Sequence, residues 1–477
     1  MKKFTLVSLA MMASASCFAQ TTLWDGENPE ISNKDYAGFW SDGKPELCDN
    51  PETNGINNSA HCLKFTINKD SKVVKLPFRE WMKPSMNGSK RISLMIKKNV
   101  NENVCVELSD PTDGSVGYWK KQVVWYSGDN KWQKLVFDFS SNGDFDNPGI
   151  MTITAQTNDF EGEQTVYIDN IVIEDAPRIN GKLFSEYNAE NPITGDLKLT
   201  GAWMKGASLN ADADWKENTY NDFEYFNSHA TDGVTSVDMR GTVTKDVDVA
   251  QFFKNPNTIV YADAAYGHAN VVVNGTAASV ELTDANAFNA PYDFTAKSVK
   301  LTRSLQNGIN SFVLPFEVSA NELGANKIAT YKSCDLGNVA NFETAESVVA
   351  NTPFLTTDAK EASELTFTNK GIVATPKTLG TDFVGVYTRI NAEGKYGIDE
   401  NGKLHMGGAK AYVNPFHAYL NVEGVTSVAF DGSVTAINNI AADKVADTAV
   451  YDLSGRRVNG KLHKGLYIMN GKKVVVK

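Results

Sequence analysis

Short apolar runs, each closed by a cluster of turn-forming residues, recur along the chain and restrict its fold more than any other feature. Residues 134–139 alternate large apolar side chains with others, as a half-buried strand does, and residues 166–173 read as a buried strand. Turn clusters at 110–114 and 127–130 separate such strands, and this pattern predicts an antiparallel β-sandwich. No helical stretch is long enough for βαβ crossovers, which excludes Rossmann and TIM-barrel architectures.

The β pattern continues from residue 178 to residue 430. Strands are predicted at 258–262, 270–273, 297–302, 311–318, 383–388 and 418–422. One short helix is predicted at Ser319, because Ser319 and Glu322 have the spacing of a capping box. We therefore expect further antiparallel β-sandwich domains after the first.

Changes in composition give the domain boundaries. Six of the eight tryptophans lie before residue 133, residues 174–177 read as a linker, and residues 431–447 are rich in alanine and asparagine. The predicted organisation is a signal peptide (1–19), a first sandwich (20–177), two spacer domains (178–318 and 319–430), a linker (431–447) and a C-terminal tail (448–477).

The first twenty residues have the pattern of a secretory signal peptide. Lys2 and Lys3 precede an apolar run of twelve residues, and small residues lead to Ala19. Cys17 raises a lipoprotein alternative, but Ser14 occupies the position where a lipobox usually has leucine. We expect cleavage near Ala19, no transmembrane segment, and a mature protein that is secreted or held at the outer-membrane surface.

Charge and histidine content narrow the function classes. The net charge of −11 repels phosphate backbones and anionic headgroups, which argues against nucleic-acid and peripheral membrane binding. The chain has six histidines, of which no two are closer than 12 residues, so no local metal-ligand spacing exists.

An exported protein folds in an oxidising compartment, where disulfide bonds between cysteines are favoured. Cys48 and Cys62 close a short polar loop, and we predict that they are bridged, which would stabilise the fold by about 3 kcal/mol. The alternative is that all four cysteines of the mature chain are unpaired thiols. For Cys105 and Cys334 we expect unpaired thiols.

The tail resembles the C-terminal sorting domain of type IX secretion. Residues 451–456, residues 464–467 and the terminal basic-valine strand carry the resemblance, and Asn470-Gly471 predicts a two-residue hairpin turn. The resemblance implies recognition by outer-membrane secretion machinery, followed by cleavage and either release or attachment to surface lipopolysaccharide. A simple terminal hairpin of the preceding domain is the alternative.

Two further stretches resemble known regions. Residues 237–420 are similar to a region common in secreted proteins of the gliding and anaerobic Gram-negative bacteria that use type IX secretion, which implies a spacer or scaffold. Residues 21–177 resemble, on 23–27, 132–139 and 167–171, the galactose-binding-like jelly rolls that include many carbohydrate-binding modules. The expected fold is all-β: an N-terminal jelly-roll β-sandwich, further antiparallel β-sandwich domains and a small C-terminal β-hairpin domain.

Aromatic residues in polar settings are the ligand candidates, because one face of a pyranose shows only C–H groups and stacks on a flat ring. These candidates are Trp81, Tyr118, Trp119 and Trp125. Core packing is the alternative for each, whereas Trp132 is expected in the core and Trp24 and Trp40 in edge packing.

Asp169 is a candidate ligand of a structural calcium. In related jelly rolls an acidic residue in the closing strand helps to bind Ca²⁺ with oxygens from the first strand, here Glu27. A solvated or hydrogen-bonded Asp169 is the alternative.

No catalytic signature is present. The motifs G-x-S-x-G, H-E-x-x-H and G-x-x-x-x-G-K-[ST] are absent, and paired carboxylates among 57 acidic residues carry no weight. We expect no enzyme, but an exported protein that binds a glycan or polysaccharide through its N-terminal jelly roll. The alternative is a structural or adhesive surface protein that binds protein partners.

Overall fold

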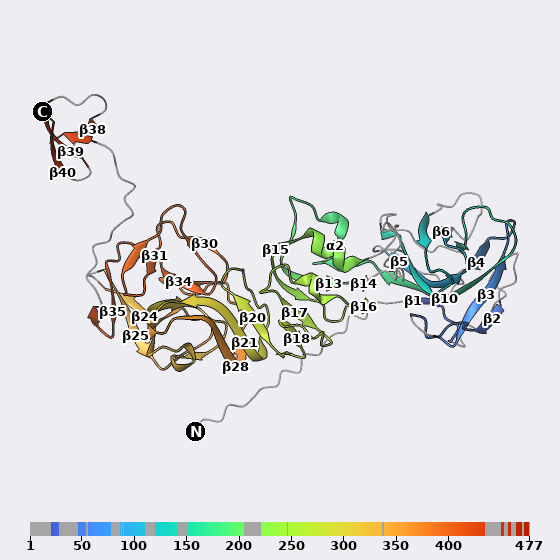
Figure 1. Cartoon of the computed structure of the whole chain (residues 1–477), viewed down its shortest axis with the longest axis horizontal. Helices are drawn as coiled ribbons and strands as arrows, with labels where there is room; N and C mark the ends of the chain where they lie inside the picture. Colours follow the sequence, from blue (N-terminus) through green and yellow to red (C-terminus); the bar gives the residue numbers. More distant parts are fainter. Residues whose placement is uncertain are drawn as a thin grey trace, which may run out of the picture. The chain divides into compact units, whose positions relative to one another are not determined.

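The computed structural model describes residues 21–27, 46–53, 56–77, 86, 88, 90–109, 120–140, 150–204, 221–245, 247–335, 338–434, 450–452, 457–458, 464–469 and 472–476. The chain divides into two compact units, Met1–Asn274 and Gly275–Lys477. Strands dominate both units, as Figure 1 shows, which confirms the predicted all-β class.

Unit 1 begins with a sandwich of two antiparallel sheets. The six-stranded sheet has the order β2 (Glu46–Asp49), β3 (His61–Ile67), β10 (Gln164–Asp175), β5 (Lys90–Lys98), β8 (Gln133–Asp138), with β1 (Thr21–Trp24) also paired to β10. The four-stranded sheet has the order β4 (Val73–Pro77), β9 (Ile150–Thr154), β6 (Glu102–Ser109), β7 (Lys120–Tyr126). The predicted strands at 134–139 and 166–173 are β8 and β10.

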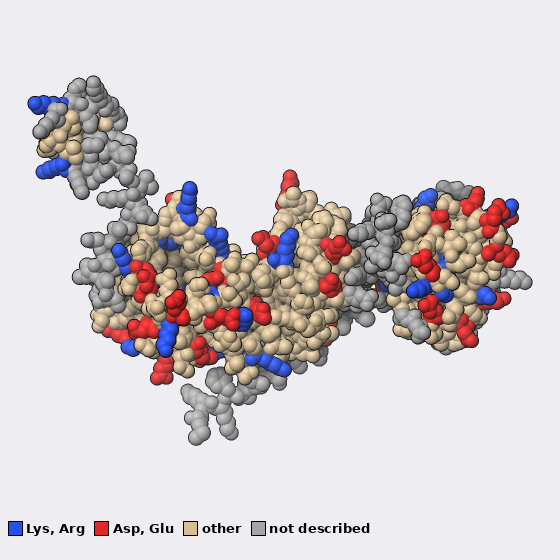
Figure 2. Space-filling model, in the orientation of Figure 1, with Lys and Arg blue, Asp and Glu red and all other residues tan. Residues whose placement is uncertain are grey.

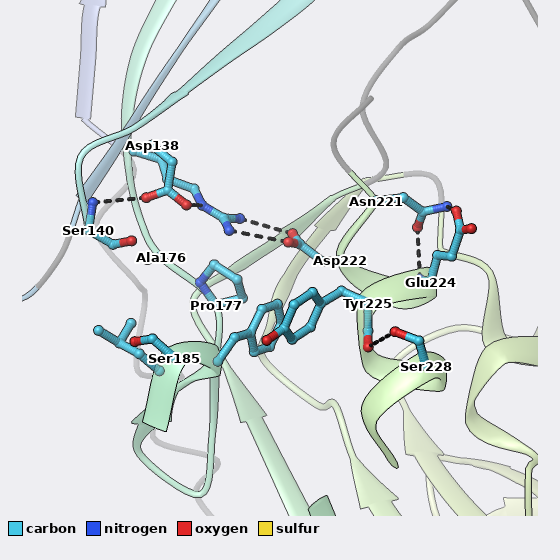
Figure 3. A pocket seen from close by; sticks show the side chains of 13 residues that line it. Asp138, Ser140, Ala176, Pro177, Ser185, Asn221, Asp222, Glu224, Tyr225 and Ser228 are labelled. Atoms are coloured by element: carbon cyan, nitrogen blue, oxygen red, sulfur yellow. Dashed lines mark hydrogen bonds and ion pairs between the residues drawn. The ribbon is translucent and has the colours of Figure 1, made fainter. Parts of the chain in front are cut away.

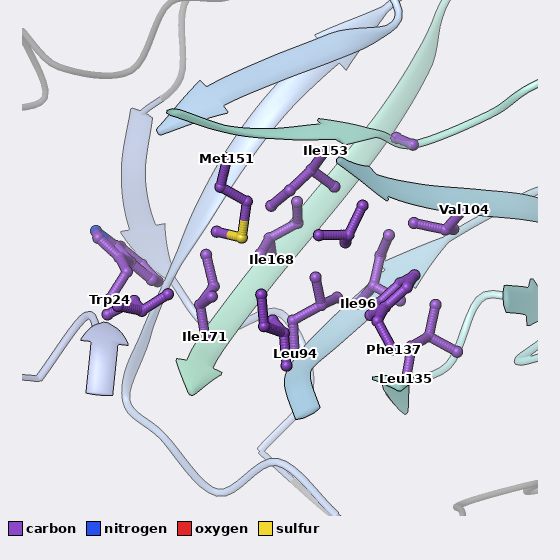
Figure 4. Packing of buried hydrophobic residues seen from close by; sticks show 14 of the residues in the cluster. Trp24, Leu94, Ile96, Val104, Leu135, Phe137, Met151, Ile153, Ile168 and Ile171 are labelled. Atoms are coloured by element: carbon purple, nitrogen blue, oxygen red, sulfur yellow. The ribbon is translucent and has the colours of Figure 1, made fainter. Parts of the chain in front are cut away.

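Alternate side chains of both sheets fill the sandwich core, which Figure 4 shows. Leu94 and Ile96 of one sheet and Val104 and Ile153 of the other are fully buried. Trp24 is 2% exposed and belongs to this core, so the expectation of edge packing for Trp24 is wrong. The reason is that β1 pairs with β10 and sets Trp24 opposite Ile171, a core residue.

After the sandwich, the strands of unit 1 pair in parallel and not in the predicted antiparallel direction. β13 (Ile193–Thr200), β15 (Ala230–Asp238), β17 (Ile259–Ala262) and β18 (Val271–Val273) form a parallel ladder, where antiparallel strands were expected. Parallel neighbours need long connections, and the one between β13 and β15 contains an unpredicted helix, α2 (Asp222–His229). Short elements complete this region: β11 (Arg178–Ile179), β12 (Lys182–Leu183), η3 (Phe184–Glu186), β14 (Ala202–Met204), β16 (Val243–Lys245) and η5 (Val249–Phe252).

α2 is fixed at its start and along its buried face. The side chain of Asn221 accepts a hydrogen bond from Glu224 N at 3.1 Å, which caps the helix. Phe223 and Phe226 are fully buried against Trp203. The helix therefore contributes its apolar face to the core of the ladder.

Before the tail, the described residues of unit 2 form three groups of four or more paired strands, besides short pairs. In the first, β19 (Thr276–Ala277) and β20 (Val280–Thr283) run parallel to β21 (Phe294–Leu305), and β28 (Ala362–Ile372) runs antiparallel to it. The second has the order β22 (Gly308–Phe312), β27 (Phe354–Ala359), β24 (Lys327–Cys334), β25 (Val339–Ala345), β35 (Ser427–Phe430), β36 (Ser433–Val434). The third has the order β29 (Phe383–Val386), β34 (His417–Leu420), β31 (Tyr396–Ile398), β32 (Leu404–Met406).

The strand pairs are β23 (Val318–Ser319) with β26 (Ser347–Val348), and β30 (Ile390–Asn391) with β33 (Tyr412–Val413). The predicted helix at Ser319 is a single 3₁₀ turn, η6 (Asn321–Leu323). Only half of the expected capping box forms: Glu322 accepts hydrogen bonds from both the backbone N and the hydroxyl of Ser319, each at 3.0 Å. Gly324, at φ 62°, ends the turn.

The tail forms a separate four-stranded antiparallel sheet of β37 (Val450–Asp452), β38 (Arg457–Val458), β39 (Gly465–Met469) and β40 (Lys472–Val476). Met469 pairs with Lys472, which confirms the predicted hairpin. Asn470 and Gly471 themselves lie outside the described residues. Within the described parts of the chain, no helix is long and apolar enough to cross a membrane.

Candidate functional site

The four-stranded sheet of the sandwich has one face on the core and one face away from it. Val104, Val106 and Leu108 of β6 are fully buried in the core. Because successive side chains of a strand point to opposite faces, Asn103, Cys105 and Glu107 lie on the other face.

The same alternation holds in the two neighbouring strands. In β9, Met151 and Ile153 belong to the core, which places Thr152 and Thr154 on the opposite face. In β7, Tyr126 is fully buried and Val124 packs against the core, which places Lys121, Val123 and Trp125 on the opposite face. We call the surface that β6, β7 and β9 form on this side the outer sheet face; its residues on these three strands are Asn103, Cys105, Glu107, Lys121, Val123, Trp125, Thr152 and Thr154.

The strand register orders the outer sheet face into rows. Trp125 pairs with Asn103. Val123 pairs with Cys105, which pairs with Thr154 on its other side. In the third row Lys121, Glu107 and Thr152 follow one another in the same way. Apolar and aromatic groups are thus concentrated on β7, and hydrogen-bonding side chains continue across β6 and β9.

Exposure of these side chains decides which can touch a ligand. Val123 is 45% exposed, and Trp125, which lies on the same face of β7, is half-buried. Cys105 is only 8% exposed, and burial raises the pKa of its thiol. The accessible part of the surface is therefore Val123, Trp125 and the polar side chains beside them.

The charges of the outer sheet face are balanced. Lys121 and Glu107 lie directly opposite each other on β7 and β6, an arrangement in which opposite charges attract. On the side of the sandwich seen in Figure 2, acidic and basic side chains are likewise interspersed. Such a surface suits an uncharged ligand better than an ionic one.

Of the four predicted ligand residues, Trp125 is the one whose position is described. Trp81, Tyr118 and Trp119 lie outside the described residues, as does Trp40. The strand alternation that places Val123 beside Trp125 was readable from the sequence, but the sequence did not say which face of the strand is buried.

Trp132, expected in the core, is 2% exposed, which confirms its burial. Its Nε1 donates to Asn50 Oδ1 at 2.9 Å, and its ring meets Tyr167 edge-on. It belongs to a small second cluster with Cys62 and Met95, which the sequence pattern does not predict.

The two candidate calcium ligands each have protein hydrogen-bond donors. Asp169 is fully buried and accepts from Asn57 Nδ2 at 2.9 Å and Ser59 Oγ at 2.6 Å. Burial raises the pKa of Asp169, and these hydrogen bonds act in the opposite direction. Glu27 accepts from the backbone N of His61 at 2.5 Å, which lowers its pKa.

These contacts match the alternative of a hydrogen-bonded Asp169. Among the described residues, no group of three or more His, Cys, Asp or Glu side chains could hold a metal ion. A calcium site at Glu27 and Asp169 stays a prediction.

The two cysteines predicted to form a disulfide face each other. Cys48 of β2 pairs directly with Cys62 of β3, and their Sγ atoms are 3.7 Å apart as thiols. Burial and the neighbouring Cys48 raise the pKa of the Cys62 thiol. The strand register thus brings the two side chains together, and the bridge itself stays a prediction.

No known family model matches the chain, and no curated protein sequence matches it significantly. Among solved structures it is similar to a carbohydrate-binding module of the β-sandwich superfamily, with 19% identity and a TM-score of 0.24, over 31% of this chain and 60% of that one. It is also similar to the CBM22-1 xylan-binding domain of Paenibacillus barcinonensis Xyn10C, with 12% identity and a TM-score of 0.23, over 33% of this chain and 92% of that one.

An exo-β-agarase is also similar, at 14% identity and a TM-score of 0.26, over 33% of this chain and 26% of that one. The chain therefore spans less than two thirds of the length of the first structure and of the agarase. Both binding modules and an enzyme are among these structures, so the function of the outer sheet face rests on its own residues.

Proposed function

We propose that the chain is a non-catalytic exported protein that binds carbohydrate through the outer sheet face of its N-terminal sandwich. One observation carries the proposal: half-buried Trp125 and 45% exposed Val123 lie together on a strand whose neighbours present amide, hydroxyl and charged side chains. A sugar needs both kinds of surface, because its C–H face packs on apolar groups and its hydroxyls require hydrogen-bond partners.

The polar side chains are placed to meet those hydroxyls. Asn103 on β6 lies directly opposite Trp125 on β7. Thr154 on β9 lies in the same row as Val123, with Cys105 between them. Each of the two apolar groups therefore has a side chain in its row that can form hydrogen bonds. The amide of Asn103 and the hydroxyl of Thr154 can both donate and accept. The balanced charges of Lys121 and Glu107 favour a neutral glycan over an acidic one.

The carboxylates of this surface favour binding over hydrolysis. A glycosidase generally uses two carboxyl groups about 5–9.5 Å apart, one on each side of the scissile bond. Glu107 is the one carboxylate among the described residues of the outer sheet face, and it pairs with Lys121. This composition supports a recognition role.

Export is part of the proposal and rests on the two ends of the sequence. Residues 1–19 have the pattern of a cleaved signal peptide. In the tail, Leu466 and Val475 pair across β39 and β40 and are 37% and 66% exposed, which offers an apolar surface to a secretion receptor. We propose that this tail directs the protein to the outer-membrane surface or the medium.

A structural or adhesive role is the second candidate function. Two exposed apolar residues of unit 2 favour it. Val349 is 65% exposed and Val373 is 42% exposed, and both line one surface pocket. Exposed apolar residues that share a surface can form a contact with another protein. This role predicts that binding to protein-coated surfaces depends on Val349 and Val373 and not on Trp125.

The test of carbohydrate binding uses the full mature chain on a broad glycan array and on insoluble polysaccharides. Trp125→Ala should weaken glycan binding at least about tenfold, because truncating a central aromatic anchor costs about 2 kcal/mol or more. Tyr412→Ala, a change of a 54% exposed aromatic residue on unit 2, is the matched control and should leave binding unchanged. Absence of any glycan ligand, or equal effects of the two changes, would remove the proposed role.

A further inference from the structure

Unit 1 contains a pocket of about 620 Å³ apart from the outer sheet face. Its lining comes from the ends of sandwich strands and from η3 and α2, as Figure 3 shows. Arg91 belongs to β5 and Asp138 to β8, Pro177 follows β10, Phe184 lies in η3 and Tyr225 in α2. The volume lies within the range of about 300–1,000 Å³ that is usual for small-molecule sites.

A closed network of charges forms one side of the pocket. Arg91 is 2% exposed and donates to both carboxylate oxygens of Asp222, at 2.9 and 3.2 Å, and its Nε donates to Asp138 at 3.2 Å. Asp222 also accepts from Met204 N at 2.9 Å. These buried charges satisfy each other, so they shape the pocket and do not call for an ionic ligand.

Aromatic and apolar side chains form a second side, and their positions are fixed before any ligand arrives. The ring of Tyr225 is stacked on Phe184 at 4.8 Å and on His229 at 4.0 Å. Pro177 and Leu183 add aliphatic surface next to this stack. A ligand with C–H groups would find an apolar wall here that costs little to order.

Hydroxyl groups form a third part of the pocket lining. Ser140, Ser185 and Ser228 line the pocket, together with the phenol of Tyr225. Ser228 Oγ donates to the backbone O of Tyr225 at 2.8 Å. The hydroxyls of Ser140, Ser185 and Tyr225 can each donate and accept a hydrogen bond, which is also what a sugar hydroxyl requires.

The net negative charge of the pocket lining disfavours anionic ligands. Arg91 is outnumbered by the carboxyl groups of Asp138, Asp222 and Glu224, so an anion would be repelled. Glu224 is exposed, and water and salt screen its attraction for a cation. A neutral ligand with both hydroxyl and C–H surface matches the lining best.

We propose that this pocket binds an uncharged, hydroxyl-rich ligand of the size of a mono- or disaccharide, at a site separate from the outer sheet face. The carrying observation is the juxtaposition of the rigid Phe184–Tyr225 wall with the hydroxyls of Ser140 and Ser185 in one pocket. The site does not depend on Trp125, so it stands or falls independently of the proposed polysaccharide binding.

The test is calorimetric titration of the full mature chain with glucose, galactose, xylose, cellobiose, lactose and maltose. At least one of these sugars should bind. Ser185→Trp, which fills the pocket from an exposed position, should lower its affinity at least tenfold. Tyr225→Phe keeps the ring stack and removes one hydroxyl, and should lower the affinity about 3- to 10-fold.

Ser363→Trp, at an exposed serine of β28 in unit 2, is the matched control and should bind as the unmodified chain does. Circular dichroism of each variant checks that it is folded. Absence of binding to all six sugars overturns the proposal. The proposal is also overturned if Ser185→Trp and Tyr225→Phe both bind the sugar as tightly as the unmodified chain. If Trp125→Ala abolishes binding in that case, the sugar binds to the outer sheet face instead.

Discussion

Arg91 and Asp222 stand 131 residues apart in the sequence and form a bidentate ion pair in the interior of unit 1. Arg91 belongs to the sandwich and Asp222 is the first residue of α2, so the pair ties the sandwich to the region that follows it. Both side chains are about 2% exposed. Val136 of the sandwich also packs with Ala202 and Met204 beside this pair.

Breaking this ion pair should destabilise unit 1. Asp222→Ala leaves the Arg91 charge buried without its bidentate partner, and losing one member of such a pair costs about 3–5 kcal/mol. Urea unfolding, followed by circular dichroism, measures the change in each variant. Glu343→Gln, which removes one member of the exposed Lys332–Glu343 pair, is the control and should cost at most about 1 kcal/mol. Similar losses in both variants would contradict the role of burial.

Lys98 should make the stability of unit 1 rise with pH in the alkaline range. Its side chain is fully buried, and its Nζ donates to the carbonyl oxygens of Ala155 and Glu102 at 2.8 and 3.2 Å. Burial lowers the pKa of Lys98 to about 8, so between pH 8 and 10.5 the folded state binds fewer protons than the unfolded state. The folded state therefore gains stability as the pH rises through this window.

Comparison with Lys98→Met isolates this effect, because the variant retains every other titrating group. The difference in unfolding free energy between the unmodified chain and Lys98→Met should shift by about 2–3 kcal/mol in favour of the unmodified chain from pH 7.5 to pH 10. Lys332→Met, a change of a 62% exposed lysine, should show no such shift. A difference independent of pH would mean that Lys98 titrates normally.

His417 should make unit 2 less stable in mild acid. Arg303 donates to its Nδ1 at 3.2 Å, and its Nε2 faces Asp284 at 3.3 Å. Burial, followed by the nearby Arg303 charge, lowers the pKa of His417 below its ordinary value of 6.5. As the pH decreases through 6.5, His417 is protonated in the unfolded state before it is protonated in the folded state. The free energy of unfolding therefore keeps its full value above pH 6.5 and falls as the pH decreases below it.

His417→Gln removes the titrating group and should flatten the stability profile of unit 2 between pH 5 and 7. Thermal unfolding at a series of pH values gives the profile. His268→Gln, a change of an exposed histidine of unit 1, should leave the profile of unit 2 as it was. A slope that survives in His417→Gln would assign the acid sensitivity to another group.

Cys48 and Cys62 should be bridged in the exported protein. Their side chains already meet across β2 and β3. Thiol labelling under denaturing, non-reducing conditions should modify Cys105 and Cys334 but neither Cys48 nor Cys62 until a reductant is added. Cys48→Ser should lower the unfolding free energy of the oxidised protein by about 3 kcal/mol. Labelling of both cysteines without a reductant would reject the bridge.

Deletion of residues 438–477 should leave the protein in the periplasm without changing its glycan binding. The tail is a small sheet of its own, and the outer sheet face lies in unit 1. Fractionation and surface labelling of cells locate the protein. If the shortened chain still reached the cell surface, the tail would be no more than the last strands of the preceding region.

Features set by neighbouring residues could be predicted from the sequence alone. Residues 134–139 alternate in hydrophobicity, and Leu135 and Phe137 are buried in β8 as this alternation requires. The Asn470-Gly471 dipeptide predicted the hairpin of β39 and β40, because that pair favours the backbone angles of a two-residue turn. The period of the pattern and the chemistry of a turn are local, so no distant contact was needed to read them.

Only the tertiary structure decided which distant residues meet. The ladder from β13 to β18 is parallel, a direction that the composition of the individual strands does not encode. Whether Trp125 faces the core or the outer sheet face depends on which side of β7 the second sheet covers. The partnership of Arg91 and Asp222 likewise depends on how the chain returns over 131 residues, and long-range packing, not local sequence, fixes that return.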